Sequence, residues 1–462
     1  MAKTVNEREI ILGILIEVTE NGKFSHVMLR DVLSKYQYLE KRDRAFITRV
    51  TEGTLEHLIE IDYILNQFSK VKVKKMKPVI RNILRSSVYQ LKYMDSVPDR
   101  AVCSEAVKLA NRKGFSGLKG YVNGVLRTIA RELDHVSYPS EGVKRLSVIY
   151  SCPEWIIELW NKSYPLETIE KMLKDFQEEK GMTIRCCRRK IAPNALEDHL
   201  KAEGVSVKSH PYLSNALVIS GYDYLESLEA FQEGLFVVQD ISSMLVGELS
   251  NVAAGSMVID LCAAPGGKSL DIAERLELEE KDVDPSKCGH VEARDLTEYK
   301  VQLIEDNIER MDMKNVTAVC QDASIFDPQS EEKADLIIAD VPCSGLGVFG
   351  KKADLKYKAS LEGIDSLVSL QRKILSCAGR YVKPGGTLLY STCTINPLEN
   401  QENVYWFLKA FPDFYLDDIE KQLHEDLKHD VEEKGMIQLL PGVHQCDGFF
   451  IARLKKKEKM GK

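Results

Sequence analysis

The second half of the chain alternates between strand-like and amphipathic segments, and this alternation limits the folds open to it. From about residue 236 the strand-like segments are "MVIDL", "HVEARD", "VTAVCQD", "ADLIIADV" and "GTLLYST". Between the last two, "IDSLVSLQRKILSCAGRYV" carries apolar residues at helical spacing. Apolar strands separated by amphipathic helices predict an α/β fold with a doubly wound parallel sheet, covered by helices on both faces. We therefore expect ligands to bind beyond the carboxyl ends of the strands.

The part of the chain before residue 236 follows other patterns. Segments such as "EREIILGILIEV" and "VIRNILRSSVYQLKYM" repeat apolar residues at helical spacing, and no alternating strand pattern occurs up to about residue 135. The next part mixes a helical segment with the strand-like "MTIRCCRRK" and "ALVIS", after "SYPSEGVKRLS", which is typical of a linker. We expect four parts: an all-helical domain over 1–140, a small α/β subdomain over 148–235, the doubly wound domain over 236–455 and a basic tail over 456–462.

Charge is distributed unevenly along the chain. The whole chain has a net charge of −7, but residues 1–150 contain 26 Lys and Arg against 17 Asp and Glu, a net +9. The remaining residues contain 37 and 53 of these, a net −16. A basic third on an acidic remainder indicates contact with a polyanion such as nucleic acid. A solvated helical surface explains the same charge equally well.

The cysteines and the apolar segments indicate the cellular compartment. The 11 cysteines lack CxxC spacing, and the adjacent Cys186 and Cys187 lack the spacing of a zinc site, so we expect reduced thiols and no metal. No apolar run approaches the roughly 18 residues of a membrane span. The segment "MAKTVNEREI" is not a secretory signal. We therefore expect a cytoplasmic protein without a membrane partner.

A glycine pair follows the first strand of the doubly wound part. In "VIDLCAAPGGKSLDIAERL", Gly266 and Gly267 come after the strand and open a helix, where free N–H groups face a ligand. The spacing matches neither GxGxxG nor the P-loop GxxxxGK[ST]. A site for an adenosine-type ligand other than a pyrophosphate is therefore favoured.

Acidic residues stand at the ends of four successive strands: Asp260, Asp295, Asp322 and Asp340. Asp295 is placed to accept both ribose hydroxyls, and Asp322 to accept from an adenine amino group. A single acid of this kind is commonly a helix N-cap. Four in a row indicate a ligand site.

Two cysteines also stand at strand ends, Cys343 in "DVPCSG" and Cys393 in "TLLYSTCTINPLENQEN". Cysteine is among the most buried residue types, so either one alone is best explained as core. Together, on one sheet edge beside the glycine pair, they indicate a functional pair of thiols.

Several segments resemble the motifs of known families. "DLCAAPGGK", "DVPCSG" and "STCTINPLENQEN" resemble the signature blocks of the RNA cytosine carbon-5 methyltransferases, the NOL/NOP/Sun family, and "FQEGLFVVQDISSMLV" and "DGFFIARL" resemble its flanking blocks. The first part resembles the NusB-like RNA-binding domain, best in "EAVKLANRKG" and "YVNGVLR". A NusB-like domain fused to this methyltransferase is similar to bacterial members that modify 16S small-subunit rRNA.

The resemblance implies a class I, Rossmann-like methyltransferase domain, S-adenosyl-L-methionine as cofactor and rRNA as partner. It implies catalytic roles for Cys393, Cys343 and Asp340. We also expect a monomer. The implied cofactor-binding residues are Cys262, Ala263, Ala264, Pro265, Gly266, Gly267, Lys268, Asp295, Asp322 and Asp340.

The implied chemistry explains why two thiols are needed. Carbon 5 of cytosine is a poor nucleophile until a thiolate adds to carbon 6, a step that the resemblance assigns to Cys393. Asp340 stabilises the charge at ring nitrogen 3, and Cys343 assists release once the methyl group is in place. The alternatives are a tRNA or another RNA as substrate, a methyltransferase acting on protein, DNA or small molecules, and a non-catalytic NusB-like RNA-binding protein.

Overall fold

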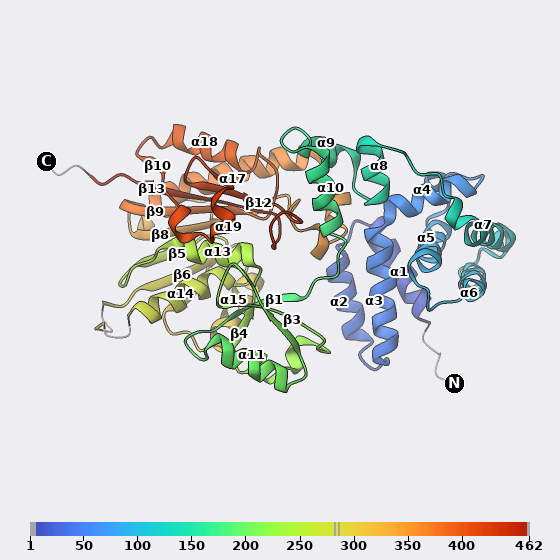
Figure 1. Ribbon diagram of the computed structural model, residues 1–462, viewed down its shortest axis with the longest axis horizontal. Coiled ribbons are helices and arrows are strands. Elements are labelled where there is room, and N and C mark those ends of the chain that lie inside the picture. Colours follow the sequence, from blue (N-terminus) through green and yellow to red (C-terminus); the bar gives the residue numbers. More distant parts are fainter. Residues whose placement is uncertain (1–5, 281–282, 285–286, 460–462) are drawn as a thin grey trace. The chain divides into compact units, whose positions relative to one another are not determined.

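The computed structural model describes residues 6–280, 283–284 and 287–459 (Figure 1). The chain forms two compact units. Unit 1 comprises Met1–Glu178 and Phe349–Ala359, and unit 2 comprises Glu179–Val348 and Ser360–Lys462. A segment from the second half of the chain is therefore part of the first unit.

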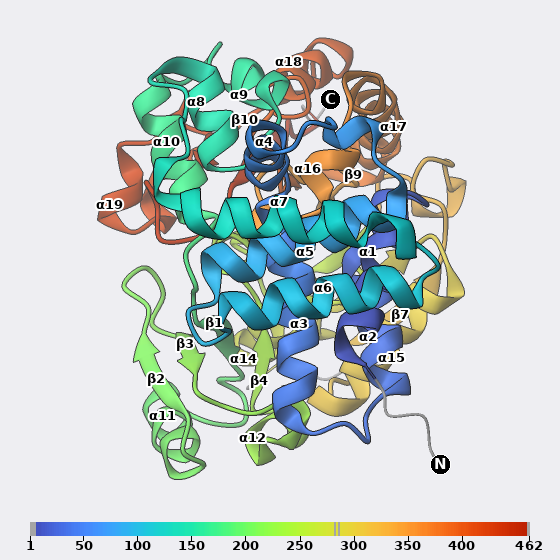
Figure 2. The same ribbon diagram turned by 90° about the vertical axis from the view of Figure 1, so that its right-hand side faces the viewer.

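Unit 1 is built from helices, which confirms the all-helical prediction for its first part. Figure 2 shows α6 and α7 running side by side. The predicted linker "SYPSEGVKRLS" is partly wrong, because α8 begins at Gly142 and buries Leu146 in the unit. The helices are α1 (Glu7–Thr19), α2 (Ser25–Lys35), α3 (Lys41–Glu56), α4 (Leu58–Phe68), α5 (Pro78–Tyr93), α6 (Asp99–Arg112), α7 (Lys119–Glu132), α8 (Gly142–Ile149), α9 (Glu154–Trp160), α10 (Leu166–Asp175) and α16 (Leu355–Lys358).

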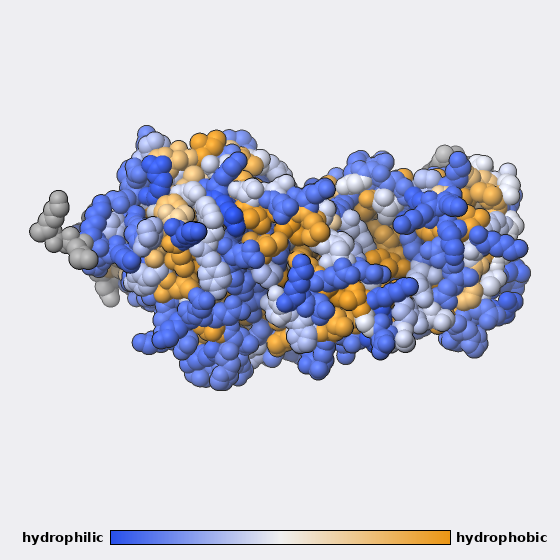
Figure 3. Space-filling view, turned by 90° about the horizontal axis from the view of Figure 1, so that it is seen from above, coloured by the Kyte–Doolittle hydropathy of each residue, from blue (hydrophilic) through white to orange (hydrophobic). Residues whose placement is uncertain are grey.

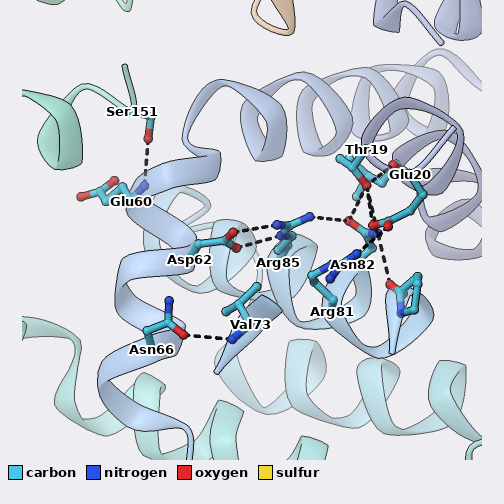
Figure 4. A network of polar contacts seen from close by, with 12 residues as sticks. Thr19, Glu20, Glu60, Asp62, Asn66, Val73, Arg81, Asn82, Arg85 and Ser151 are labelled. Carbon is cyan, nitrogen blue, oxygen red and sulfur yellow. Dashed lines mark hydrogen bonds and ion pairs between the residues drawn. The ribbon is translucent and has the colours of Figure 1, made fainter. Parts of the chain in front are cut away.

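A polar network connects three helices of unit 1 (Figure 4). Arg85 on α5 donates from Nε and Nη2 to the two carboxylate oxygens of Asp62 on α4, at 2.8 and 2.6 Å. Its Nη1 donates to Asn82 Oδ1 at 3.3 Å, and Asn82 Nδ2 donates to Thr19 Oγ1 on α1 at 3.2 Å. Each guanidinium nitrogen of Arg85 thus has a partner, which a largely buried cation requires.

The segment Phe349–Ala359 is held in unit 1 by its polar side chains. Lys356 Nζ donates at 2.9 Å to the carbonyl oxygen of Glu56, the last residue of α3. A cation is favoured at this negative end of a helix. Ser25 Oγ donates to Asp354 Oδ1 at 2.6 Å. Burial lowers the pKa of Lys356 to about 8.

The first part of unit 2 is a small antiparallel sheet with its own apolar core around Ile184, Leu217 and Phe236. The strands predicted in "MTIRCCRRK" and "ALVIS" are confirmed. The elements are β1 (Met182–Cys186), α11 (Pro193–Ala202), β2 (Ser206–Ser209), β3 (Ala216–Ser220), α12 (Glu229–Gln232) and β4 (Phe236–Val238), with the strand order β2-β3-β1-β4.

The main sheet of unit 2 contains the five predicted strands as its parallel part, in the order β7-β6-β5-β8-β9. The order reverses between β5 and β8, and such a switch point is where α/β sheets bind ligands. Antiparallel strands extend the sheet beyond β9, which the sequence pattern did not predict. The strands are β5 (Met257–Asp260), β6 (His290–Asp295), β7 (Val316–Cys320), β8 (Ala334–Asp340), β9 (Val382–Thr392), β10 (Phe414–Leu416), β11 (Val431–Glu432), β12 (Met436–Leu439) and β13 (Phe449–Lys456).

Helices cover both faces of this sheet, as predicted (Figure 1). Consecutive strand residues enter different cores: Val258 packs in one cluster with α13 and α14, and Ile259 packs in the other with α17 and α18. This alternation follows from the two-residue period of a strand. The helices are α13 (Ile241–Ser250), α14 (Gly267–Glu279), α15 (Glu298–Met311), α17 (Leu361–Tyr381), α18 (Gln401–Ala410) and α19 (Glu425–Lys428).

The end of the described chain differs from the predicted basic tail. Strand β13 continues to Lys456, whose Nζ donates to the carbonyl oxygen of Val382 at 2.9 Å, so the range 456–462 begins inside the sheet. Residues 460–462 of that tail lie outside the described residues. On the face seen in Figure 3, hydrophilic side chains surround scattered hydrophobic patches. Among the described helices, none is both long and apolar enough to cross a membrane.

Candidate active site

The glycine pair forms the turn between β5 and α14. Gly266 is the N-cap of α14 with φ of 103°, a left-handed conformation that favours glycine. Asp260, at the end of β5, accepts from Ser269 Oγ at 2.7 Å through Oδ2. Its Oδ1 is buried and has no hydrogen-bond partner among the described residues. Burial raises the pKa of Asp260 to about 7. A buried acceptor without a partner at a switch point suits a donor group on a ligand.

Asp295 and Asp322 follow the next two strands of the sheet. Asp295 ends β6 and accepts from the backbone N–H of Ala264 at 2.9 Å, which ties it to the glycine turn. Its other oxygen accepts from Lys300 Nζ at 2.9 Å. Asp322 lies two residues beyond β7 and accepts from the N–H and Oγ of Ser324, at 2.8 and 2.7 Å. Asp322 thus stabilises the turn after β7, and it is not the N-cap of any described helix.

Asp340 joins three elements at the switch point. Lying at the end of β8, it accepts from Lys268 Nζ of α14 at 2.6 Å and from Ser391 Oγ of β9 at 2.8 Å. Burial alone would lower the pKa of Lys268, but the Asp340 carboxylate outweighs it and raises that pKa. The sequence analysis expected Lys268 and Asp340 as separate cofactor-binding residues, and in the structure they form an ion pair.

The two strand-end cysteines meet in the structure. Strands β8 and β9 are parallel neighbours with Asp340 opposite Ser391, so the residues that follow them come together. The sulfurs of Cys343 and Cys393 are 3.2 Å apart. The hydrogen bond to Cys393, together with burial, raises the pKa of Cys343 well above its usual value. Cys343 therefore stays a protonated thiol in this arrangement.

Sequence reasoning missed the polar residues that support these cysteines. Glu399, Asn396 and Gln371 are all buried, and the side-chain amides of Asn396 and Gln371 both donate to the Glu399 carboxylate. The available signal was the run of acids and amides in "NPLENQEN", which is unusual directly after a buried strand.

Unit 1 carries a basic groove of about 910 Å³ between α6 and α7. Along α6, Arg100, Ser104 and Lys108 recur every four residues and so lie on one helix face. Arg127, Lys119 and Arg100 form no ion pair with a carboxylate among the described residues. The charged residues that line the groove are Arg100, Lys108, Lys119, Arg127, Arg131 and one carboxylate, Asp99.

Three protein-family models match three successive parts of the chain. The model described as 16S rRNA methyltransferase RsmB/F matches residues 249–455. The NusB family matches residues 5–131. A ferredoxin-like domain of RsmF/B-like methyltransferases matches residues 152–223.

Two individual proteins resemble the chain over nearly its whole length, and a third resembles about two thirds of it. A relative from Bacillus subtilis (strain 168), described as a probable ribosomal RNA small subunit methyltransferase B, is 36% identical and covers 98% of this chain and 100% of its own. The crystal structure of PH0851 superposes with a TM-score of 0.80 at 26% identity, covering 98% of this chain and 100% of that one. NSun6 from Pyrococcus horikoshii with SFG shares the fold, with a TM-score of 0.55 at 23% identity, covering 66% of this chain and 99% of that one.

The family of this chain follows from the Bacillus subtilis relative, which it matches over nearly the full length of both proteins. The residues of the candidate active site agree with that family. The glycine turn, the strand-end acids and the paired thiols lie within the range that the methyltransferase model matches. The chain therefore belongs to the RsmB/F family of S-adenosylmethionine-dependent methyltransferases and carries the family's NusB and ferredoxin-like domains.

Proposed function

We propose that this protein methylates carbon 5 of a specific cytosine in 16S small-subunit rRNA, through a covalent bond between Cys393 and the base. The observation that carries the proposal is the pair of sulfurs 3.2 Å apart on the sheet edge that also carries Asp340. In this proposal residues 1–140 are a NusB-like RNA-binding domain, 148–235 a small α/β subdomain and 236–455 the methyltransferase domain.

The cofactor site fits S-adenosylmethionine by the chemistry of its residues. The segment from Cys262 to Lys268 would hold the methionine end, Asp295 the ribose and Asp322 the adenine side. The structure adds Asp260, whose free buried oxygen is a suitable acceptor for an amino group. When bound, S-adenosylmethionine supplies a methyl group activated by a positively charged sulfur.

The chain's own residues then divide the work on the base. Cys393 as thiolate forms a bond to carbon 6, and the electron pair moves into the ring, which makes carbon 5 nucleophilic. Lys268 lies close enough to Cys393 for the two charges to attract, which favours the thiolate. In this proposal a proton passes to ring nitrogen 3 by way of Asp340 as the thiolate adds, which stabilises the charge that develops there. After carbon 5 is methylated, a base removes its proton, the bond to Cys393 breaks and the aromatic ring is restored.

The protonated state of Cys343 limits its part in that last step. Before the base binds, its raised pKa makes it a poor proton acceptor. Once Cys393 is bonded to carbon 6, the negative charge beside Cys343 is gone. The Cys343 thiol can then release its proton to water, and the resulting thiolate accepts the carbon-5 proton directly or through a water.

The basic groove of unit 1 supports contact with the RNA backbone. It brings five cations to one surface against a single carboxylate. Lysine and arginine side chains that neutralise phosphates supply sequence-independent affinity. We propose that this groove holds a phosphate backbone while an unpaired cytosine enters the methyltransferase site, since an unpaired base costs little to extrude.

The most informative test maps 5-methylcytosine in rRNA from cells with and without this gene. We expect one cytosine of 16S rRNA to lose its methyl group when the gene is deleted and to regain it on complementation. In parallel, the protein is incubated with labelled S-adenosylmethionine and separate pools of rRNA, tRNA, DNA and protein. Label in tRNA alone would favour the alternative RNA substrate. Label only in protein or DNA would overturn the proposal, and no label in any pool would favour a non-catalytic RNA-binding protein.

A further inference from the structure

Glu399 lies beside the loops that carry the two cysteines and is fully buried, with 0% of its surface exposed. Its carboxylate accepts four hydrogen bonds. The N–H and Oγ of Ser344 donate at 2.8 and 2.5 Å, Asn396 Nδ2 donates at 2.9 Å and Gln371 Nε2 donates at 3.0 Å. One side chain thus connects its own loop with the loop of Ser344 and with α17, which carries Gln371.

These contacts connect the two loops that carry the thiols. Ser344 directly follows Cys343, and Asn396 is three residues beyond Cys393. Ser344 Oγ also lies 2.8 Å from the Oγ1 of Thr394, the residue after Cys393. Hence the relative position of the loops depends on donors that converge at one carboxylate.

A helix supplies the fixed point for this arrangement. Gln371 on α17 is itself fully buried, and its Nε2 donates to the carbonyl oxygen of Pro342 at 2.9 Å as well as to Glu399. Pro342 directly precedes Cys343. The Cys343 loop is therefore held on both sides of the cysteine, by Gln371 before it and by Glu399 after it.

All four donors to Glu399 are neutral. No cation among the described residues forms an ion pair with its carboxylate. Burying a carboxylate without a cation is costly, and the cost is offset only when the donors are well placed. The same carboxylate also raises the pKa of Cys343. A side chain of this kind is a poor choice for stability alone, which points to a role in the arrangement of the site.

We propose that Glu399 is a positioning residue that fixes the Cys343 loop against the Cys393 loop and thereby sets the distance between the two sulfurs. Its consequence for catalysis rests on the proposed function. Cys393 bonds to carbon 6 and Cys343 serves the adjacent carbon 5, so the two thiols must reach neighbouring ring atoms. A displacement of about 1 Å in such a site costs on the order of 10²-fold in rate.

The test replaces Glu399 by glutamine, which has nearly the same shape. Each carboxylate oxygen accepts from two of the four donors, so the amide nitrogen that replaces one oxygen leaves two donors without their acceptor. The first readout uses no RNA. A diazene oxidant removes one hydrogen atom from each thiol and joins the sulfurs, and mass spectrometry follows the Cys343–Cys393 disulfide. We expect Glu399→Gln to slow this reaction at least tenfold.

The second readout is the single-turnover formation of the covalent RNA adduct. We expect adduct formation in Glu399→Gln to slow by about 10²-fold while the affinity for S-adenosylmethionine stays unchanged. Glu280→Gln is the matched control. Glu280 is a buried carboxylate that accepts from the backbone N–H groups of Gly255 and Gly289, each at 2.7 Å. These glycines precede the N-terminal ends of β5 and β6, whereas the cofactor site lies at the C-terminal ends. This variant should keep both rates.

The outcomes separate the two proposals. Wild-type rates of disulfide and adduct formation in Glu399→Gln would overturn the positioning role. If that variant does not fold, Asn396→Ser removes a single donor and should slow disulfide formation by a smaller factor; an unchanged rate there would overturn the role as well. A slowed disulfide reaction, in a protein whose wild type methylates no RNA, would support the positioning role and overturn the proposed function.

Discussion

The buried polar groups of unit 1 and those of the active-site edge in unit 2 are satisfied in different ways. In unit 1 the three nitrogens of Arg85 all have partners, two of them on the Asp62 carboxylate (Figure 4). In unit 2 Asp260 keeps a buried oxygen without a partner among the described residues, and the thiol of Cys343 has a raised pKa. The Arg85 network fixes helices, whereas at the switch point of the main sheet an unmet hydrogen bond and a shifted thiol pKa occur together, as they do in sites that bind and react.

The largest effect should come from the thiol assigned as nucleophile. We expect Cys393→Ala to lower methylation by at least about 10³-fold, because it removes the thiol that the proposed function bonds to carbon 6. Binding of S-adenosylmethionine, measured by calorimetry, should remain, since the glycine turn is untouched. Methylation at the wild-type rate would refute the nucleophile assignment.

Cys343→Ala should separate bond formation from release. Cys393 remains able to add to the base, but the step that frees the product is impaired, so a covalent protein–RNA complex should accumulate. Denaturing gels with labelled RNA detect it, and the double variant with Cys393→Ala is the control that should show none. Normal turnover without any complex would exclude Cys343 from the mechanism.

The unit 1 network should matter for stability and not for chemistry. Arg85→Ala leaves Asp62 without its cation and should lower the free energy of unfolding by roughly 3 kcal/mol. Chemical denaturation followed through unit 1 measures this loss. The rate of methyl transfer at saturating RNA should be unchanged below the unfolding transition. A loss of rate without a loss of stability would place this network in function and break the comparison.

Lys356 of unit 1 should affect the stability of the protein in a pH-dependent way. Burial lowers its folded-state pKa to about 8, below the unfolded value, so between these values the unfolded chain binds more protons and stability rises with pH. The destabilisation is fully present below pH 8, at most roughly 3 kcal/mol. Lys356→Met lacks this titration. Its stability relative to wild type should therefore be greatest near pH 7 and decline towards pH 10, and a flat difference curve would contradict the shifted pKa.

The smallest effect concerns the basic groove. Arg127→Glu should weaken RNA binding and lower the salt slope of the affinity by about one unit per lost phosphate contact. Arg42→Glu, at an exposed position of α3 outside the residues that line the groove, changes the net charge by the same amount and is the control. An unchanged salt slope in Arg127→Glu would mean that the charge of unit 1 is only a solvated surface.

Local patterns predicted much of this molecule. The five parallel strands, the helices between them and the glycine turn could all be read from segments shorter than about 20 residues, because hydrophobic period and glycine conformation are local properties. The antiparallel strands beyond β9 and the place of Phe349–Ala359 in unit 1 were not predicted, since neither has a distinctive local pattern. The boundaries expected at 140, 148 and 235 stay predictions.

The sequence by itself determined which side chains stand at strand ends: Asp260, Asp295, Asp340, Cys343 and Cys393. Only the tertiary structure decided which of them meet. Cys343 and Cys393 are 50 residues apart along the chain and 3.2 Å apart in space, because β8 and β9 are parallel neighbours in register. The role of Glu399 has the same origin. Three of its four donor groups belong to Ser344 and Gln371, which are distant in the sequence, and the tertiary structure brings them to one carboxylate.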